Sequence, residues 1–256
     1  MTKKLKSPPE NFEQECTTVW SFPRRWNWAT HNSKYRWNWS PEVVRNLILR
    51  YSKEWDLLLD SMIWGGTTAI EAKLLNRNLI WYDINPQAVE LSKSLLNFKL
   101  DPETSSGWQA KIEIYQFDAR RKNSKIKDES IDFVLMHPPY VDIIKYSDWI
   151  RWDLSQIHDV DEFIKQIKKV AKEAFRVLKP WKFCAVLMWD TRRNKMYIPL
   201  AFKVMEQFLK VGFVLKEDII KIQHNCKATW FWVNKSKEYN FLLIMHEHLF
   251  IFKKPE

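Results

Sequence analysis

Glycine is scarce in this chain: it provides 4 of the 256 residues, whereas it makes up about 7% of an average protein. Few turns can therefore use the positive φ that glycine adopts without steric cost. Tryptophan is abundant instead, with 15 residues. Ten of the tryptophans stand where a turn or a close approach of backbone would ordinarily take glycine: Trp26, Trp37, Trp55, Trp64, Trp81, Trp149, Trp152, Trp181, Trp189 and Trp230.

This exchange of residue types leads to a hypothesis about the gene. In this hypothesis the codon UGA encodes glycine in the gene but has been translated as tryptophan. Returning these ten residues to glycine brings the glycine content close to the average. Their codons should then be UGA, whereas the codons of Trp20, Trp28, Trp39 and Trp232 should be UGG. The alternative is that the tryptophans are genuine and that they damage the site in which they stand.

Cysteine and long apolar runs are scarce as well. Cys16, Cys184 and Cys226 are scattered and odd in number, so they predict no disulfide framework and favour a reducing compartment, the cytoplasm. No apolar stretch is long enough to span a membrane, and the polar start lacks the apolar core of a signal peptide. The histidines at 224 and 246–248 lack the paired spacing of a zinc site, so we expect strand histidines and no metal.

Positive charge, in contrast, is plentiful. The net charge of +10 suits a polyanionic partner such as nucleic acid, although many basic proteins bind none. A chain of 256 residues is long enough for one domain with a full core. We interpret residues 1–16 as a polar N-terminal arm and residues 17–256 as the domain. Within the domain, residues 17–39 are rich in aromatic and basic side chains without a clear period, which predicts an ordered loop.

The hydrophobic pattern of the domain alternates between strands and helices. Helical spacing predicts helices at about 41–52, 69–75, 86–96, 161–178 and 197–211. Apolar or alternating runs predict strands near 56–60, 79–83, 111–117, 131–136, 183–188, 213–222 and 241–252. This alternation predicts an α/β fold: a Rossmann-like, mostly parallel seven-stranded sheet with helices on both faces and an antiparallel last strand.

Two of the predicted strands end in unusual turns. The strand at 131–136 runs into His137-Pro138-Pro139-Tyr140, where the chain must leave the sheet because proline donates no backbone N–H. The strand at 56–60 is followed by a Gly/Thr turn, a helix, and a strand that ends in the carboxylate of Asp83. This is the plan of a nucleoside-binding unit, in which N–H groups at a helix start approach the ligand. Ligands of open α/β sheets bind at the carboxyl ends of the strands.

Together these motifs resemble those of the amino-group methyltransferases that use S-adenosylmethionine, the DNA N6-adenine and N4-cytosine methylases. The family's cofactor motif, Asp-Pro-Phe-x-Gly-Ser-Gly-Thr-Thr, is similar to Asp60-Ser61-Met62-Ile63-Trp64-Gly65-Gly66-Thr67-Thr68. Its catalytic motif, Asp/Asn/Ser-Pro-Pro-Tyr/Phe, is similar to residues 137–140. The helix predicted at 41–52 resembles the family's helix before the cofactor strand, whose start contacts the methionine part. The resemblance covers roughly residues 17–254, so the domain is expected to be a methyltransferase domain.

The resemblance implies S-adenosylmethionine as the cofactor. In the family's pattern, Asp83 would hold the ribose and Asp118 the adenine amino group. Trp64 stands at the family's first glycine, where an indole would fill the pocket or displace the loop. We therefore expect the literal sequence to bind the cofactor weakly, and Trp64→Gly, together with Trp81→Gly, to restore binding. The implied cofactor-binding residues are Ser40, Pro41, Asp60, Trp64, Gly65, Gly66, Thr67, Thr68, Asp83, Ile84 and Asp118.

The resemblance also implies methyl transfer to an exocyclic amino group of a base, with His137, Pro138, Pro139 and Tyr140 as the catalytic residues. Such an amine is a poor nucleophile because its lone pair is delocalised into the ring. If both N–H groups donate to fixed acceptors, here the His137 side chain and the Pro138 carbonyl, the nitrogen can pyramidalise. Tyr140 would stack on a base that has left the duplex.

His137 departs from the Asp, Asn or Ser of the family. A neutral imidazole offers one acceptor nitrogen, in the right tautomer only, and loses it on protonation. We therefore expect activity to fall as the pH drops through the imidazole titration. The alternative is a histidine that only caps the strand.

The nucleic acid and the base are left open. Basic and aromatic residues at 190–198 and 223–240 suit phosphate contact and base stacking, which points to Arg192, Arg193, Lys195 and Lys227 as nucleic-acid contacts. Double-stranded DNA is the first expectation, as for a restriction-modification methylase. One alternative is an RNA base methyltransferase, such as a tRNA guanine-N2 enzyme, although those usually carry a separate RNA-binding domain. Another is a non-catalytic nucleic-acid-binding protein that has lost its cofactor pocket.

Overall fold

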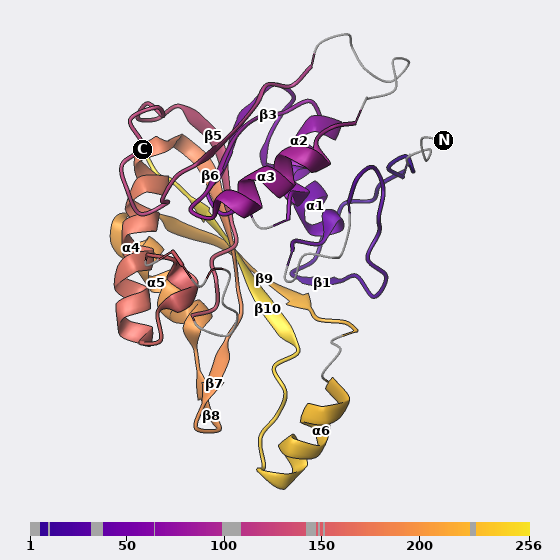
Figure 1. Ribbon diagram of the computed structural model, residues 1–256, viewed down its shortest axis with the longest axis vertical. Helices are drawn as coiled ribbons and strands as arrows, with labels where there is room; N and C mark the ends of the chain where they lie inside the picture. The colour runs from indigo at the N-terminus through magenta and orange to yellow at the C-terminus, as the bar shows by residue number, and fades with distance from the viewer. Residues whose placement is uncertain are drawn as a thin grey trace.

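The computed structural model describes residues 6–9, 11–31, 38–63, 65–98, 109–141, 147, 149–150, 152–225 and 229–256. Its body is one large sheet with helices on both faces (Figure 1). The order of the eight strands in the sheet is β1-β9-β10-β6-β5-β2-β3-β4. Their bounds are β1 Val19–Ser21, β2 Leu57–Asp60, β3 Asn78–Asp83, β4 Ile112–Gln116, β5 Ile131–Met136, β6 Leu178–Met188, β9 Val214–Ile222 and β10 His246–Lys253.

The helices begin at residues suited to start them. Asn85 and Asp159 accept backbone N–H groups at the starts of α3 and α4, from Gln87 (2.9 Å) and Glu162 (2.7 Å), and Pro41 opens α1. None of the described helices combines the length and the apolar character needed to cross a membrane. The bounds are α1 Pro41–Tyr51, α2 Thr67–Leu74, α3 Pro86–Leu95, the short 3-10 helix η1 Leu154–Gln156, α4 Val160–Val177, α5 Leu200–Val211 and α6 Thr229–Glu238.

The directions of the strands confirm the predicted Rossmann-like α/β class. β10 runs antiparallel to both β6 and β9, as predicted for the last strand. The pairs β2–β3, β2–β5, β3–β4, β5–β6 and β1–β9 are parallel. From β2 the chain first builds outward through β3 and β4, and then continues on the other side with β5. The carboxyl ends of β2 to β5 therefore share one edge of the sheet at a topological switch point, where such folds bind ligands.

The prediction of seven strands is wrong by one, because the segment predicted as an ordered loop contains β1. This strand pairs parallel to β9, with Trp20 opposite Lys221. The Trp20 side chain is buried, and its neighbours Val19 and Ser21 are exposed. Three residues are too few to show a period-two pattern in sequence. The sequence therefore did not reveal that this segment pairs with β9, about 200 residues further on.

Several further boundaries differ from prediction. Strand β6 begins at Leu178, five residues before the predicted start at 183. The segment 190–198 is a hairpin, β7 Thr191–Arg193 and β8 Met196–Ile198, and the segment 223–240 contains α6. The last strand begins at His246, and α5 begins at Leu200, directly after a proline. The predicted polar arm also makes contacts: the Glu15 N–H donates to Asn46 of α1 (2.7 Å). The local composition of these segments therefore did not predict where each element begins or which backbone conformation it adopts.

The core has two layers, one on each face of the sheet. Neighbouring residues of a strand point to opposite faces, so Val134 packs among the residues beneath α4 and α5, and Phe133 among those beneath α1 to α3. Figure 1 shows these two groups of helices on either side of the sheet. The two apolar layers hold the strand ends at the edge that carries the candidate site.

The tryptophans fall into two groups in the structure. Trp20 and Trp28, which we expect to be genuine, are fully buried. Trp55 and Trp181, which we expect to be glycine, are largely exposed and have φ of 68° and 65°, in the left-handed region. A bulky side chain at positive φ is a genuine outlier, whereas glycine adopts this region freely. Two residues are exceptions: Trp232 is expected to be genuine and is 49% exposed, and Trp81 is expected to be glycine and is fully buried.

Candidate functional site

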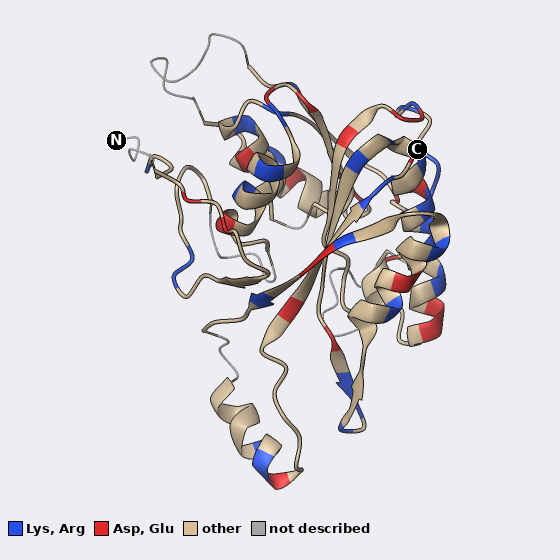
Figure 2. Cartoon of the chain, turned by 180° about the vertical axis from the view of Figure 1, so that it is seen from behind, with Lys and Arg blue, Asp and Glu red and all other residues tan. Residues whose placement is uncertain are grey.

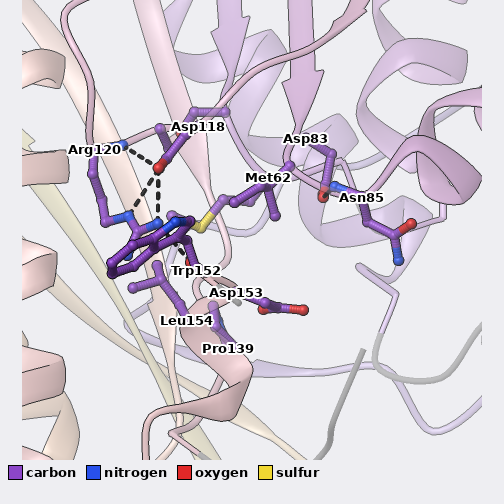
Figure 3. Close-up of a pocket in the computed structure, with 12 residues that line it drawn as sticks. Met62, Asp83, Asn85, Asp118, Arg120, Pro139, Trp152, Asp153 and Leu154 are labelled. Atoms are coloured by element: carbon purple, nitrogen blue, oxygen red, sulfur yellow. Dashed lines mark hydrogen bonds and ion pairs between the residues drawn. The ribbon is translucent and has the colours of Figure 1, made fainter. Parts of the chain in front are cut away.

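A pocket of about 60 Å³ lies at the carboxyl edge of the sheet (Figure 3). Strands β3 and β4 and the turn after β5 contribute to its wall. Four predicted residues from three separate segments line it together: Asp83, Ile84, Asp118 and Pro139. They meet because the carboxyl ends of parallel neighbouring strands share an edge. The other lining residues are Ser61, Met62, Asn85, Ala119, Arg120, Trp152, Asp153 and Leu154.

Asp83 has a fixed orientation at the end of β3. Its Oδ2 accepts the backbone N–H of Ile63 (3.0 Å), and its Oδ1 accepts that of Asn85 (2.8 Å). Each carboxylate oxygen has a second lone pair for a further donor. The side chain is therefore an oriented acceptor in the wall of the pocket.

Asp118, at the end of β4, is engaged by Arg120. The Arg120 Nε donates to Oδ1 and Nη2 to Oδ2, both at 2.8 Å, and the Arg120 backbone N–H also donates to Oδ1 (3.0 Å). Burial alone would raise the pKa of the Asp118 carboxyl, but the guanidinium outweighs it and holds the pKa below its ordinary value. Nη2 of Arg120 also donates to the Trp152 carbonyl (2.5 Å). Both oxygens of Asp118 are therefore already bound by a side chain of this protein.

Residues 65–68, the Gly/Thr part of the turn between β2 and α2, do not line the pocket, whereas Ser61 and Met62 at the start of the same turn do. Gly66 has a φ of 90°, in the region that favours glycine. A Cβ on Gly65 would lie 2.7 Å from the Asn38 side chain. Asn38 in turn accepts the Thr67 hydroxyl (2.8 Å), and Thr68 is buried. Trp64 lies outside the described residues, so the expectation for it stays a prediction.

Asp60 ends β2 next to this turn and is fully buried. Its Oδ1 accepts the Met62 N–H (3.0 Å). Burial raises the pKa of the Asp60 carboxyl to about 7, because the charged form loses its hydration. Asp60 therefore contributes a carboxyl that is partly protonated at neutral pH.

The turn after β5 carries a buried hydrogen-bonded chain. His137 Nε2 is hydrogen-bonded to the Tyr140 hydroxyl, and that hydroxyl donates to Oε1 of Glu247 (2.6 Å). Glu247 Oε2 accepts Nζ of Lys221 (2.8 Å). Tyr140 is 2% exposed, and its ring packs edge-on against Trp189 (6.0 Å). In this arrangement the ring that we expect to stack on a base is covered by protein.

Burial also controls the protonation of this turn. It lowers the pKa of the His137 imidazole to about 4, so the ring is neutral at physiological pH. The expected acid limit of activity accordingly moves to about 4, below the usual imidazole range. Val141, directly after the turn, has a φ of 57°, which is strained for a β-branched residue. Such strain clusters at functional sites.

The start of α1 lies beside this turn and not beside the pocket. Trp39 packs edge-on against the His137 ring, with ring centroids 5.3 Å apart. Ser40 and Pro41 follow directly, and the Ser40 hydroxyl donates to Glu42. Neither residue lines the pocket. The predicted cofactor residues are thus divided between the pocket wall and the layer behind it.

Three of the predicted nucleic-acid contacts, Arg192, Arg193 and Lys195, belong to the β7–β8 hairpin and the turn between its strands, where Figure 2 shows basic residues. Arg192 Nη2 donates to the Leu242 carbonyl (2.9 Å), and its guanidinium lies 5.3 Å from the Phe241 ring. Nζ of Lys195 lies 3.8 Å from the Tyr239 ring centroid. Arg192 and Lys195 therefore tie the hairpin to the segment after α6. Arg193 is half-buried on the same hairpin, and Lys227 lies outside the described residues.

Sequence reasoning missed two groups of residues. Arg120 and Trp152 restrict the pocket, and Glu247 with Lys221 reaches the catalytic turn. A signal for Glu247 was available, because a glutamate inside an apolar strand requires a partner. Within the described residues, no three His, Cys, Asp or Glu side chains gather as a metal site would require.

The model of a family described as DNA methylase matches residues 1–94 and 131–256. An uncharacterized protein of Methanocaldococcus jannaschii is 30% identical over 162 residues, which are 63% of this chain and 48% of that protein. The chain thus spans about half the length of this curated relative.

Two solved structures share the fold. A SAM-dependent methyltransferase from Methanosarcina mazei superposes with a TM-score of 0.54 at 16% identity, covering 82% of this chain and 98% of that one. TrmN from Thermus thermophilus superposes with a TM-score of 0.55 at 16% identity, covering 86% of this chain and 50% of that one. At these identities the likeness concerns the fold alone.

Proposed function

Because this chain belongs to the DNA methylase family, whose cofactor is S-adenosylmethionine, we propose that it methylates an exocyclic amino group of a DNA base, adenine N6 or cytosine N4. One observation carries the proposal. Pro139 of the His137-Pro138-Pro139-Tyr140 turn lines the same pocket as Asp83 and Asp118. A methyl donor held by the two carboxylate-bearing strand ends would therefore lie next to the acceptors for the target amine.

The chemistry of the pocket fits a nucleoside. Asp83 is an oriented acceptor for ribose hydroxyls, and Met62, Ile84 and Leu154 provide apolar wall. The pocket volume of about 60 Å³ is well below the roughly 300–1,000 Å³ of sites that enclose a drug-sized ligand. Binding therefore requires side chains in the wall to turn outward, and Arg120 and Trp152 are the largest of them.

The bound cofactor would supply an electrophilic methyl group. In the proposed reaction the Pro138 carbonyl and the neutral His137 ring accept the two N–H groups of the target amine. The nitrogen would then direct its lone pair at the methyl carbon, and the new C–N bond would form as the methyl–sulfur bond breaks and S-adenosylhomocysteine leaves. One proton of the amine would pass to solvent. The hydrogen bonds of the turn keep the acceptors in place, so less reorganisation is needed during the reaction.

We propose that nucleic acid is bound by the hairpin together with α6. Helix α6 has no buried residue, and Phe231 and Trp232, both outside the set expected to be glycine, are 45% and 49% exposed. Exposed aromatic rings beside lysine and arginine suit base stacking and phosphate contact. In Figure 1 this helix projects away from the sheet, so it could follow a duplex whose flipped base enters the site.

The test is transfer of a tritiated methyl group from S-adenosylmethionine to duplex DNA, to single-stranded DNA and to tRNA, followed by nucleoside analysis. The expected product is N6-methyladenosine or N4-methylcytidine in the deoxy form, from DNA only. The His137→Ala variant is the matched control and should lose the product. Transfer to tRNA guanine alone would establish the RNA base methyltransferase instead. DNA binding without transfer, under conditions where the cofactor binds, would contradict the proposal and favour the non-catalytic alternative.

A further inference from the structure

Glu247 and Lys221 connect the catalytic turn to the opposite half of the sheet. The two residues stand directly opposite each other on β10 and β9, and Nζ of Lys221 lies 2.8 Å from Oε2 of Glu247. The other carboxylate oxygen, Oε1, accepts the Tyr140 hydroxyl at 2.6 Å. His137, Tyr140 and Glu247 are each 2% exposed. Solvent water therefore has little access to this chain of hydrogen bonds.

The hydrogen bonds that link Lys221, Glu247, Tyr140 and His137 can have only one donor-to-acceptor orientation. Lys221 is a donor without an acceptor, and an ionised carboxylate is an acceptor without a donor. The single proton of the Tyr140 hydroxyl therefore goes to Glu247. The hydroxyl oxygen then faces His137 as an acceptor, so the Nε2 to which it is hydrogen-bonded must carry a hydrogen. In a neutral imidazole the other nitrogen, Nδ1, then has the lone pair.

The ionisation states required by this argument agree with the environment. Burial alone would raise the pKa of the Glu247 carboxyl, but the Lys221 ammonium outweighs it and keeps the pKa below its ordinary value. The His137 ring is neutral because burial lowers its pKa to about 4. An ionised Glu247 and a neutral His137 are therefore both present at physiological pH.

We propose that Glu247, held by Lys221, is a positioning residue that sets the tautomer of His137 through the Tyr140 hydroxyl, so that Nδ1 is the acceptor for the amino group of the target base. The role of Nδ1 rests on the proposed function. The tautomer itself is a property of the free protein, whatever its substrate. This hydrogen-bonded link from Glu247 through Tyr140 would explain how a histidine can occupy a position where the family has Asp, Asn or Ser.

The tautomer is measured directly by ¹⁵N NMR of histidine-labelled protein, because protonated and lone-pair nitrogens of imidazole have widely separated shifts. The His137→Asn variant, which lacks one of the six histidines, assigns the His137 signals. In the unaltered protein at neutral pH, the expected result is a hydrogen on Nε2 and a lone pair on Nδ1. The opposite tautomer, or a protonated ring, overturns the proposal without any activity measurement.

The Glu247→Gln variant tests whether Glu247 sets the tautomer of His137. Lys221 can only donate, so it takes the amide oxygen and turns the amide NH₂ toward Tyr140. The hydroxyl then accepts from the amide and donates to His137 Nε2, which moves the ring hydrogen to Nδ1. In the double variant Lys221→Met/Glu247→Gln the amide is free to turn its oxygen back, and the original tautomer should return. An unchanged tautomer in Glu247→Gln overturns the proposal.

A second variant covers the case in which Glu247→Gln does not fold. Tyr140→Phe keeps the ring and removes only the hydroxyl that relays the hydrogen bond. Oε1 of Glu247 lies 4.0 Å from Nε2 of His137, so a weaker preference for a hydrogen on Nε2 remains, and the proposal expects a larger share of the Nδ1-protonated tautomer than in the unaltered protein. An unchanged tautomer population overturns it.

Kinetics then separate this inference from the proposed function. The kcat of Glu247→Gln should fall about tenfold or more while KM for the cofactor stays within about twofold. In the His137→Asn background, where no tautomer exists, the same substitution should change kcat less than about threefold. An equal loss in both backgrounds assigns Glu247 a merely structural role and overturns the proposal. If no variant and no unaltered protein transfers a methyl group, the proposed function fails, and the NMR result still decides the tautomer.

Discussion

Arg120 binds both carboxylate oxygens of Asp118, each at 2.8 Å, and extends the same guanidinium to the Trp152 carbonyl at 2.5 Å. Asp118 is the residue for which the family's pattern expects an adenine contact. In the structure a side chain of the protein itself occupies that contact, and Trp152 stands beside it in the pocket wall (Figure 3). Cofactor binding must therefore compete with this arrangement.

We predict that Trp152→Gly tightens the binding of S-adenosylmethionine. Removal of the indole enlarges the pocket, and Trp152 is one of the residues for which glycine is expected in the natural protein. Affinity should rise by about tenfold or more, measured by calorimetry. Trp149→Gly is the control, because Trp149 is equally exposed at 59% and does not line the pocket. Equal effects of both substitutions would contradict a specific obstruction by Trp152.

We predict that Asp83→Asn weakens cofactor binding. The amide replaces one acceptor oxygen by a donor and removes the charge, and a hydrogen bond to a charged group contributes roughly 1.5–3 kcal/mol. The dissociation constant should therefore increase by roughly 10- to 100-fold. Glu113→Gln, at an exposed position of β4, serves as the control and should bind normally. Normal affinity of Asp83→Asn in calorimetry would exclude Asp83 as a cofactor contact.

The pKa of His137 predicts how stability depends on pH. Between about 4 and the ordinary imidazole value near 6.5, the unfolded chain binds a proton that the folded protein does not. The free energy of unfolding should therefore fall as the pH drops from 6.5 to 4. At about 1.4 kcal/mol per pKa unit, this loss amounts to about 3 kcal/mol.

Asp60 acts in the opposite direction over the same range. Its folded pKa of about 7 lies above the ordinary 3.8, so its contribution to stability is present at low pH and is lost as the pH rises toward 7. The His137 contribution is isolated by comparing urea unfolding of the unaltered protein and His137→Asn across this range. The variant should lose less stability on acidification. Parallel curves would show that His137 does not have a depressed pKa.

We predict that Trp55→Gly and Trp181→Gly each stabilise the protein. Both residues have positive φ, which costs a bulky side chain about 1–2 kcal/mol. Glycine removes this cost, partly offset by its greater freedom in the unfolded chain. The net gain of up to about 1 kcal/mol should appear as a higher urea midpoint. Trp20→Gly, in the core, should destabilise strongly by leaving a cavity.

The codons of the gene test directly whether these tryptophans are genuine. UGA at the ten expected positions with UGG at Trp20, Trp28, Trp39 and Trp232 would establish it. UGG at Trp55 and Trp181 would show that strained tryptophans are genuine there. Destabilisation of either Trp→Gly variant would show that the indole packing outweighs the strain.

We predict that Phe231→Ala and Trp232→Ala weaken DNA binding, because stacking on a base contributes roughly 1–3 kcal/mol. Fluorescence anisotropy with a labelled duplex should give dissociation constants about fivefold higher or more. Leu209→Ala on α5 is the control, with a similarly exposed apolar side chain at 39%. Cofactor affinity should not change in any of the three. Unchanged DNA affinity in both aromatic variants would remove α6 from the interface.

The sequence alone determined the fold class and four of the twelve residues that line the pocket. Its periodicities predicted the strands that end at Asp60, Asp83 and near Asp118, because a two- or 3.6-residue period is a local property. Once these strands are parallel neighbours, their carboxyl ends must meet at one edge, so Asp83, Asp118 and Pro139 could be placed together. The proline pair after β5 marked the exit from the sheet for an equally local reason, its missing N–H groups.

Only the tertiary structure decided which side chains meet across that edge. Glu247 reaches Tyr140 across 107 positions of sequence, because β10 inserts antiparallel between β6 and β9. The three residues of β1 form a strand because β9 offers a free edge. Arg120 lies close in sequence to Asp118, but whether its guanidinium binds that carboxylate depends on the fold of the surrounding loops. Contacts of this kind depend on strand order and side-chain packing, which no local pattern of residues records.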